Sequence, residues 1–277
     1  MDLSTTTLVC PRNDEEALTI LKLAKAIGLA TVVSRQPHGA KLFKEKRLIG
    51  HIMEANENTQ TVAIVEIPGP ETEVMLRGQG LEVLIIDHHR YDEVDRRNAK
   101  SSLEQFRDLF GIDDEKAKAL GFDPWLLASV AAIDRGFVWE LRKMNYTQEE
   151  IRRALDHYRT LTLELGEERR LREEQAAEVA WERREERDGL IIVRSAENDI
   201  SVRDPLSFIL AKNFDGPREV LIVQGKRRMY VQDTSHATEL FDAFGGFTFG
   251  GDRCWGILKS DEILPPEEEV IAILLKK

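Results

Sequence analysis

The most unusual residues of this sequence stand at the end of an apolar segment in its first half. The stretch "VLIIDHHRYDE" (83–93) places Asp87, His88 and His89 directly after four apolar residues. A strand that only filled a core would more naturally run out into Gly, Asn or Ser, because these three side chains are costly to desolvate. Carboxylates and imidazoles also bind divalent metal ions. The stretch therefore predicts a functional site.

Two further apolar runs in the same half deliver acidic side chains at or near their ends. The run "TTLVC" (6–10) is followed by Asp14 and Glu16, and "TVAIVEI" (61–67) carries Glu66. Ligands of open parallel sheets bind beyond the carboxyl ends of the strands, so the three runs could share one crevice. Several carboxylates stay ionised together only if a cation offsets their repulsion, and with imidazoles they suit Mn²⁺ or Mg²⁺ better than structural zinc. Taken singly, Asp14 and Glu16 could equally be the cap and first-turn acids of a helix.

The pattern around these residues predicts a doubly wound α/β domain. Continuous apolar runs, typical of strands covered on both faces of a mainly parallel sheet, alternate with amphipathic segments typical of helices. The expected strands are 6–10, 29–34, 61–67 and 81–87, and the expected helices are 13–28, 41–56, 102–111 and 123–144.

A charged segment separates this half from a second, smaller α/β unit. Residues 147–188 mix acids and bases around sparse Leu, Ala and Trp, which is typical of a solvated helix, with a break near Gly166. Further strands are expected at 190–195, 219–225 and 228–233, and further helices at 204–214 and 236–244. The predicted organisation is a first domain over 1–160, a helical connector over 161–189 and a C-terminal domain over 190–277.

The composition restricts the class of protein. The chain has 277 residues, 42% apolar and 32% charged, and a formal net charge of −11, which argues against a surface for long duplex nucleic acid. Two cysteines make no disulfide framework, and no apolar run approaches the ~20 residues that span a bilayer. The start lacks a signal-peptide pattern. We expect a cytoplasmic protein that does not bind membranes, and leave open whether it forms a homodimer.

The acidic and histidine motifs resemble those of the DHH phosphoesterase superfamily, in an order that covers nearly the whole chain. The superfamily's third motif is intact at residues 87–89. Its first motif, His-x-x-x-Asp-x-Asp-Ala, is matched with Cys10 at the histidine, Asp14 at the first aspartate and Glu16 at the second.

The remaining motifs of the superfamily are also recognisable. Glu66 matches a strand-terminal aspartate, and Asp134 in "AAIDRGF" matches an aspartate before Gly-Phe. The C-terminal Gly-Gly-His motif is similar to "GGFTFGGD", where Phe247 replaces the histidine. The glycines kept in this stretch are Gly245, Gly246, Gly250 and Gly251.

The resemblance implies a metal-dependent phosphoesterase that hydrolyses small nucleotides or short oligonucleotides in a cleft between the two domains. Two divalent ions, with Mn²⁺ preferred over Mg²⁺, would activate a bridging water for attack on phosphorus. The implied ligands are Asp14, Glu16, Glu66, His88 and Asp134, with Cys10 a doubtful sixth.

Other residues would act on the substrate or orient the ligands. Asp87 would orient an imidazole, and His89 would face the phosphoryl group. The glycine-rich loop over 245–251 would bind a terminal phosphate, with Arg253 as a charge clamp. Phe247 could stack on a base, although packing explains an aromatic residue there at least as well.

The departures from the motifs leave two alternatives open. Glutamate lengthens a ligand arm by one methylene, and cysteine in place of histidine could favour Zn²⁺ or Fe²⁺. The chain could therefore be a nucleotide-binding or sensing relative that has lost hydrolysis. An inorganic pyrophosphatase is the other alternative.

Overall fold

The structure is a computed structural model that describes residues 1–37, 39–259 and 263–276. It divides into two compact units, which are described separately below. The first comprises residues 1–89, 96–134 and 146–165, and the second comprises residues 90–95, 135–145 and 166–277. Composition marks neither 90–95 nor 135–145 as part of the second unit. The three-part organisation with boundaries at 160 and 189 stays a prediction.

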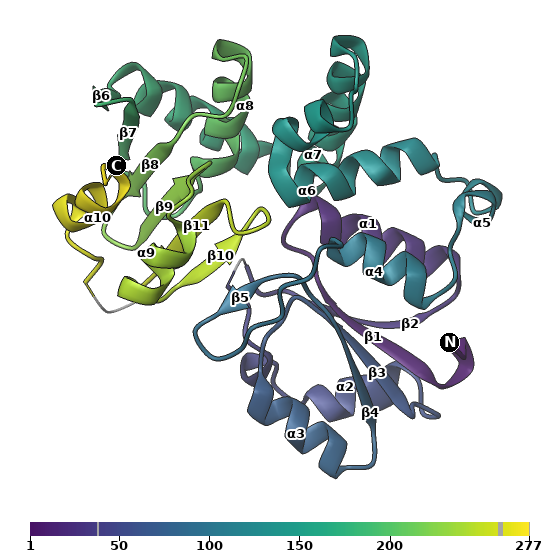
Figure 1. Cartoon of the computed structure of the whole chain (residues 1–277). Coiled ribbons are helices and arrows are strands. Elements are labelled where there is room, and N and C mark those ends of the chain that lie inside the picture. The colour runs from purple at the N-terminus through teal and green to yellow at the C-terminus, as the bar shows by residue number, and fades with distance from the viewer. Residues whose placement is uncertain (38, 260–262, 277) are drawn as a thin grey trace. The chain divides into compact units, whose positions relative to one another are not determined.

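A four-stranded parallel sheet of order β2-β1-β3-β4 forms the centre of the first unit (Figure 1). Its strands start and end within two residues of the expected ones: β1 (Thr6–Pro11), β2 (Ala30–Ser34), β3 (Thr61–Val65) and β4 (Glu82–Ile86). Leu8 lies opposite Ala63, and Ala63 lies opposite Leu84. Because β1, β3 and β4 run in one direction, their carboxyl ends lie at the same edge of the sheet.

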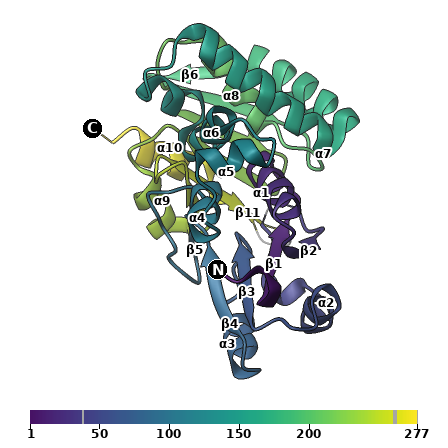
Figure 2. The ribbon, with the colours of Figure 1, turned by 90° about the vertical axis from the view of Figure 1, so that its right-hand side faces the viewer.

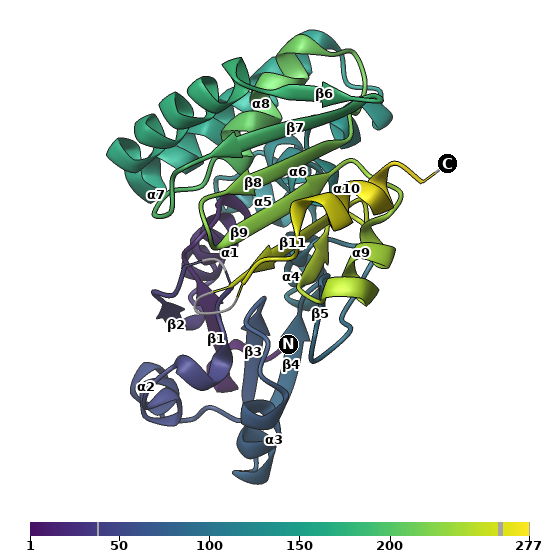
Figure 3. The same ribbon diagram turned by 90° about the vertical axis from the view of Figure 1, so that its left-hand side faces the viewer.

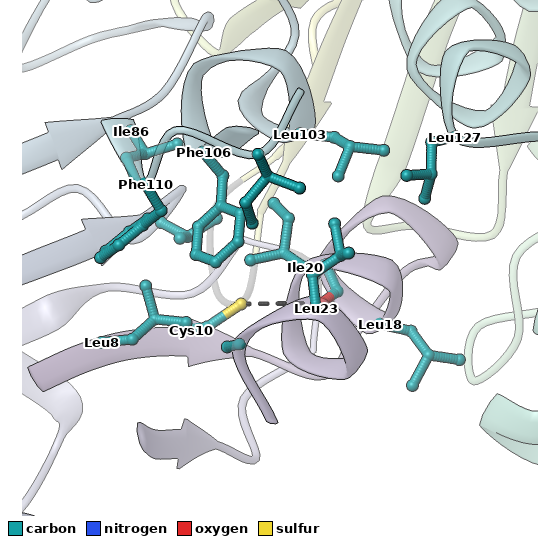
Figure 4. Packing of buried hydrophobic residues seen from close by; sticks show 14 of the residues in the cluster. Leu8, Cys10, Leu18, Ile20, Leu23, Ile86, Leu103, Phe106, Phe110 and Leu127 are labelled. Carbon is teal, nitrogen blue, oxygen red and sulfur yellow. Dashed lines mark hydrogen bonds between the residues drawn. The ribbon is translucent and has the colours of Figure 1, made fainter. Parts of the chain in front are cut away.

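Helices cover both faces of this sheet, which confirms the doubly wound α/β class. Leu8 and Cys10 of β1 pack in one apolar cluster with α1 (Glu15–Ala26) and α4 (Ser102–Leu109), as Figure 4 shows. The intervening Val9 packs in a second cluster on the opposite face. This two-residue alternation is the period of a strand buried on both sides.

The opposite face is covered by α2 (Leu48–Ala55), by the short 3₁₀ helix η2 (Leu42–Lys44) and by α3 (Pro70–Gly78), which contacts β4 (Figure 2). Helix α3 is absent from the sequence-based expectation. Its apolar residues Val74 and Met75 are exposed and Leu76 alone is buried among them, so no amphipathic stripe marks it. Pro70 at its first position has a preset φ that suits a helix start, but in sequence the preceding Pro-Gly resembles a turn.

The second unit contains a seven-stranded sheet of order β5-β10-β11-β9-β8-β7-β6, in which β7 and β8 are parallel and the other pairs antiparallel. Figure 3 shows β6 to β9 side by side. The strands are β5 (Arg90–Tyr91), β6 (Glu185–Arg187), β7 (Leu190–Ser195), β8 (Val220–Gln224), β9 (Arg228–Gln232), β10 (Phe247–Phe249) and β11 (Cys254–Leu258). The expected strands of this half are confirmed, and β5, β6 and β10 are too short to carry a periodic signal.

Helices cover this second sheet on both faces as well. One apolar cluster joins it to α9 (Ala237–Phe244) and α10 (Glu267–Leu274), and another joins it to α8 (Arg203–Asn213) and the later part of α7 (Gln148–Glu182). Trp255 of β11 is fully buried.

Two long helices are interrupted by non-helical residues. Helix α6 (Pro124–Lys143) is broken at Gly136 and Phe137, and α7 is broken at Gly166, where the sequence predicts a break. Short helices complete the described chain: η1 (Leu3–Thr5) and α5 (Asp114–Ala119). None of the helices in the described ranges combines the length and the apolar character that crossing a bilayer requires.

Candidate metal centre

Four side chains from separate segments of the first unit converge beyond the carboxyl edge of its sheet. Potential ligand atoms of Glu16, Glu66, His88 and Asp134 all lie within 4.8 Å of one another. All four residues are implied metal ligands of the motif resemblance. The structure therefore brings together residues that are as many as 118 positions apart in the sequence, from position 16 to position 134.

Glu16 reaches the cluster from the first turn of α1. Asp14 caps this helix, and its Oδ1 accepts a hydrogen bond from the Ala17 amide at 2.7 Å. The Glu16 carboxylate accepts a hydrogen bond from the Leu103 amide at 2.9 Å, in the first turn of α4. Because amides at a helix N-terminus carry partial positive charge, α4 fixes one oxygen of Glu16 and leaves Oε2 for the cluster.

Glu66 follows the last residue of β3 and has a left-handed backbone. Its amide still donates to the Ile86 carbonyl at 3.1 Å, so the ladder between β3 and β4 extends to this residue. Its φ of 49° lies in a region that costs a non-glycine residue on the order of 1–3 kcal/mol. Such strain is concentrated at functional sites, and here it accompanies a carboxylate turned into the cluster.

The DHH sequence forms a tight turn after β4. The Asp87 carboxylate accepts hydrogen bonds from the His88 and His89 amides at 2.8 and 3.1 Å, and its Oδ1 lies 3.0 Å from Nδ1 of His89. His88 Nε2 lies 2.9 Å from Asp134 Oδ2 and 3.3 Å from Glu66 Oε1. Asp87 thus contacts both following amides and the His89 ring, while His88 points into the cluster.

His89 lies at the border of the cluster. Its ring centroid is 4.3 Å from that of His88, and it forms a second group of potential ligands with Glu66 and His88. Its side chain is partly accessible, whereas that of His88 is buried. This position fits a side chain that faces an incoming substrate.

The polar atoms at the centre of the four-residue cluster have no hydrogen-bond partner outside it. Within the described ranges, Glu16 Oε2, Glu66 Oε1, His88 Nε2 and Asp134 Oδ2 are all buried, and the only polar atoms they face belong to the cluster itself. Such atoms are rare in folded proteins, and several in one place call for an ion or ordered water. Three carboxylate oxygens and one imidazole nitrogen make a donor set of the kind that binds divalent metal ions. The residues present therefore fit a divalent metal ion.

Buried acids in and beside the cluster raise one another's pKa values. Burial and the charges of Asp134 and Glu66 raise the pKa of Glu16 well above its ordinary value. Burial and the charge of Glu66 likewise raise the pKa of Asp14. In both cases the structure without a cation favours the protonated carboxyl.

His88 and Asp134 form the opposite case, because each supplies the other's counter-charge. Burial opposes charge on His88, but the negative charges and hydrogen-bond acceptors of Asp134 and Glu66 outweigh it, so the pKa of His88 is well above its usual value. Burial likewise opposes charge on Asp134, but the charge and hydrogen bond of His88 hold the pKa of Asp134 below its usual value. In the absence of metal, a proton on His88 takes the place that a cation would fill.

Cys10 and Asp14, the other two implied ligands, do not join the four-residue cluster. The Cys10 side chain lies in the apolar core, and its Sγ contacts the Ala17 carbonyl at 3.7 Å (Figure 4). Burial and the charges of Asp14, Glu66 and Glu16 raise the pKa of this thiol well above its ordinary value. Since the thiolate is the form that binds metal, Cys10 is poorly placed as a ligand, and Asp14 has the role of a helix cap.

The glycine-rich stretch lies in the second unit, where the conformation of its glycines has a structural reason. A Cβ on Gly245 would lie 2.7 Å from Asp92 Oδ1, and one on Gly246 would lie 2.3 Å from the Gly256 carbonyl oxygen. Both have positive φ, as do Gly250 and Gly251. The amides of Gly245 and Gly246 already donate within the unit, to the Phe241 carbonyl and to the Asp92 carboxylate at 2.8 Å each.

The aromatic and basic residues of this stretch also have partners within the unit. Phe247 and Phe249 pack together, with ring centroids 5.7 Å apart, against the cluster that includes α8. Arg253 lies 3.4 Å from an oxygen of Asp233, which also accepts a hydrogen bond from Trp139 at 2.8 Å. The substrate-binding roles predicted for these residues stay predictions.

The sequence-based reasoning missed the residues that hold the DHH turn from outside. Gln105 donates to the Asp87 carbonyl at 2.9 Å, and Arg96 lies between Glu73 and Asp87. Arg96 lies in the polar stretch "DEVDRRNAK" (92–100), where no sequence pattern distinguishes it from the neighbouring basic residues. The heptad-like or alternating patterns that mark core positions give no signal in such a loop.

Of the comparisons with known proteins, only the one with solved structures found matches. No family model matches the chain, and no curated protein matches it. The crystal structure of exonuclease RecJ bound to manganese matches with a TM-score of 0.42 and 15% identity, over 92% of this chain and 86% of that one. An exopolyphosphatase-related protein from Bacteroides fragilis matches with a TM-score of 0.48 and 10% identity, over 97% and 89% of the two chains.

A pGpG-specific phosphodiesterase from Vibrio cholerae also matches, with a TM-score of 0.38 and 12% identity, over 99% of this chain and 97% of that one. The motif residues Glu16, Glu66, His88 and Asp134 meet in one place.

Proposed function

We propose that this protein is a divergent DHH-type phosphoesterase that uses a divalent metal ion, Mn²⁺ in the first place, to hydrolyse phosphate esters of small nucleotides or short oligonucleotides. The single observation that carries the proposal is the convergence of four buried ligand atoms, from Glu16, Glu66, His88 and Asp134, that face only one another. Three buried carboxylates around one imidazole carry more negative charge than a single proton on His88 offsets, and a divalent cation would balance it.

The four cluster residues would hold the ion, and the ion would supply a water of lowered pKa and positive charge for the phosphoryl oxygens. The chain's own residues do the rest. Asp87 binds the Nδ1 side of His89, which leaves Nε2 as the nitrogen that would take up a proton and donate it to a phosphoryl oxygen or leaving group. The hydrogen bond from α4 to Glu16 holds that carboxylate in the cluster.

A substrate of small size agrees with the charge of the chain. The net charge of −11 disfavours long nucleic acids, whose binding depends on neutralising many phosphates. We propose the glycine-rich stretch over 245–251, with Phe247 and Arg253, as the part of the chain that contacts the substrate's terminal phosphate or base.

The test is Mn²⁺-dependent hydrolysis by protein freed of metal with chelator and then reloaded. The substrates are thymidine 5′-(p-nitrophenyl phosphate), short 5′-phosphorylated oligonucleotides and inorganic pyrophosphate. We expect turnover of a phosphodiester with Mn²⁺, and a loss of at least about 100-fold in His88→Ala, because a direct ligand is worth at least as much as the residues behind it.

The matched control is His236→Ala in the second unit. His236 Nδ1 lies 3.1 Å from Glu239 Oε2, so this substitution also removes a histidine paired with an acid, without touching the cluster. Equal losses in both variants, or no turnover of any of these substrates with Mn²⁺, Mg²⁺, Zn²⁺ or Fe²⁺, would contradict the proposal.

A non-hydrolysing nucleotide-binding protein is the second candidate, and the positions of Cys10 and Asp14 favour it. A second ion would need ligands of the first motif, and in this structure Cys10 is in the core while Asp14 caps α1. Nucleotide binding together with one bound metal ion per chain and no product would identify this function.

A further inference from the structure

A buried ion-pair network contacts Asp87 of the DHH segment. Arg96 donates to the Glu73 carboxylate through Nη2, and its Nη1 forms an ion pair with Asp87 Oδ2 at 3.9 Å, without a direct hydrogen bond. The side chains of Arg96, Glu73 and Asp87 are 9%, 7% and 0% exposed. One guanidinium thus lies between two carboxylates that are both shielded from water.

Each end of this network is anchored to backbone. Glu73 also accepts a hydrogen bond from the Gly69 amide at 3.2 Å, at the start of α3. The Arg96 amide donates to the His89 carbonyl at 3.0 Å. Arg96 therefore holds the DHH turn twice, through the Asp87 side chain and through the backbone of His89.

Stability alone is a weak reason for such a network. A buried ion pair often adds nothing over apolar residues of the same size, because both charges lose their hydration. A network of this kind is instead suited to fixing geometry. Asp87 connects the network to both histidines. Its Oδ1 accepts hydrogen bonds from the His88 and His89 amides and lies next to Nδ1 of the His89 ring.

We propose that Arg96, held by Glu73, is a positioning residue that fixes the Asp87 carboxylate and through it the orientation of His88 and the ring tautomer of His89. An Asp87 oxygen that faces Nδ1 of His89 as an acceptor places the ring proton there, which leaves Nε2 without a proton in the neutral ring. Arginine suits this place because its two Nη groups stand apart in a rigid plane and face different carboxylates, whereas lysine offers one compact ammonium on a flexible stem.

The inference rests on the metal site of the proposed function, but neither of its two readouts measures hydrolysis. The first is the affinity for Mn²⁺ alone, by calorimetric titration of metal-free protein. The second is the tautomer of His89 in metal-free protein, read from the side-chain ¹⁵N shifts of the six histidines and assigned with His89→Gln.

We expect Arg96→Met to lower Mn²⁺ affinity by about 10- to 100-fold and to add the Nε2-protonated form of His89. Arg96→Lys should give an intermediate loss. The control is Arg107→Met, which removes another partly buried arginine of the first unit, paired with Asp114 at 2.8 Å, and should leave both readouts unchanged.

Asp87→Asn keeps the shape of the side chain and provides the test if Arg96→Met does not fold. It should reproduce both effects, and Arg96→Lys combined with Asp87→Asn should be no worse than Asp87→Asn alone, because the two residues act through one contact. Mn²⁺ affinity within about threefold of wild type and an unchanged His89 tautomer in Arg96→Met or in Asp87→Asn would overturn the inference. If the wild type itself binds no Mn²⁺, the proposed function fails, and the tautomer still decides the role of Arg96.

Discussion

The two units of this protein treat buried polar side chains in opposite ways. In the second unit, fully buried Gln224 donates to the Glu197 and Ile200 carbonyls and accepts from the Val202 amide. In the first unit, four ionisable side chains meet, and their buried atoms face only one another. Hydrogen bonds to backbone groups stabilise the fold, whereas several buried acids in one place oppose it unless a positive charge offsets their repulsion.

The second unit also contains unpaired buried atoms within the described residues, and they sharpen the contrast. Arg142 Nε and Gln232 Oε1 each lack a hydrogen bond. They belong to side chains with other partners, since Gln232 Nε2 donates to Ser207 at 2.8 Å and Arg142 Nη1 donates to the Asp215 carbonyl. Isolated unpaired atoms of this kind do not form a donor set, and the four atoms of the first unit do.

The largest expected effect comes from removing one charge of the cluster. Glu16→Gln keeps the oxygen that accepts from Leu103 but removes a carboxylate, so we expect Mn²⁺ affinity to fall at least about 100-fold. The same change should raise the unfolding free energy of metal-free protein at pH 8 by about 1–3 kcal/mol, because a buried like charge is removed. Calorimetric titration and denaturant unfolding measure the two quantities. A destabilised metal-free Glu16→Gln protein would contradict our interpretation of the cluster.

The next effect is the pH dependence of the metal-free protein. Folding raises the pKa of Asp14, Glu16 and His88 above their ordinary values of 3.8, 4.5 and 6.5, so the folded state holds more protons than the unfolded state above those values. The unfolding free energy therefore falls as pH rises from about 4.5 toward 8, with a slope of up to about 1.4 kcal/mol per pH unit for each extra proton. The lowered pKa of Asp134 acts in the opposite sense and only below its ordinary value of 3.8.

Denaturant unfolding in chelator between pH 4.5 and 8 measures this slope. Saturating Mn²⁺ should reduce it and add about 2.7 kcal/mol when the metal is 100-fold above its dissociation constant. A metal-free protein whose stability rises with pH over this window would show that the cluster acids are not desolvated as described.

The third prediction concerns a paired group of the second unit. Gln224→Ala removes a side chain that serves three backbone groups and leaves them buried, so we expect a loss of about 1–3 kcal/mol in the unfolding free energy. Mn²⁺ affinity should stay at the wild-type value. A change in Mn²⁺ affinity would contradict the view that the buried hydrogen bonds of Gln224 serve stability alone.

The smallest effect is expected at Cys10. Cys10→Ala should cost about 1 kcal/mol of stability, since it removes one small buried atom, and should leave the Mn²⁺ stoichiometry unchanged. Loss of a bound ion in this variant would show that Cys10 leaves the core to bind metal.

Much of the fold was predictable because its signals are local. The strands at 6–10, 61–67 and 81–87 are continuous apolar runs, and the structure buries them on both faces of a parallel sheet. Helix α3 and the short strands were not predictable, since Val74 and Met75 point outward and strand β5 contains two residues. A short element gets its stability from the neighbours it pairs with, and its own sequence carries little of that information.

The sequence predicted which types of residue form the candidate site, but it did not predict which individual side chains meet there. The positions of Glu16, Glu66 and His88 follow from the rule that parallel strands end at one edge. Asp134 entered by motif resemblance, and it contacts His88 from a position two residues before the break in helix α6 at Gly136. Arg96 carried no signal, because its role depends on Glu73 and Asp87 being within reach in three dimensions.

The sequence by itself determined that apolar strands end in acids and histidines, and hence predicted a metal-binding edge. Tertiary structure alone decided that Cys10 packs in the core and that Glu16, Glu66, His88 and Asp134 are the side chains that meet. The physical reason is range. Strand periodicity and capping act between residues a few positions apart, whereas a cation site is defined by atoms a few ångströms apart whose residues are brought together only when the sheet and its helices are packed.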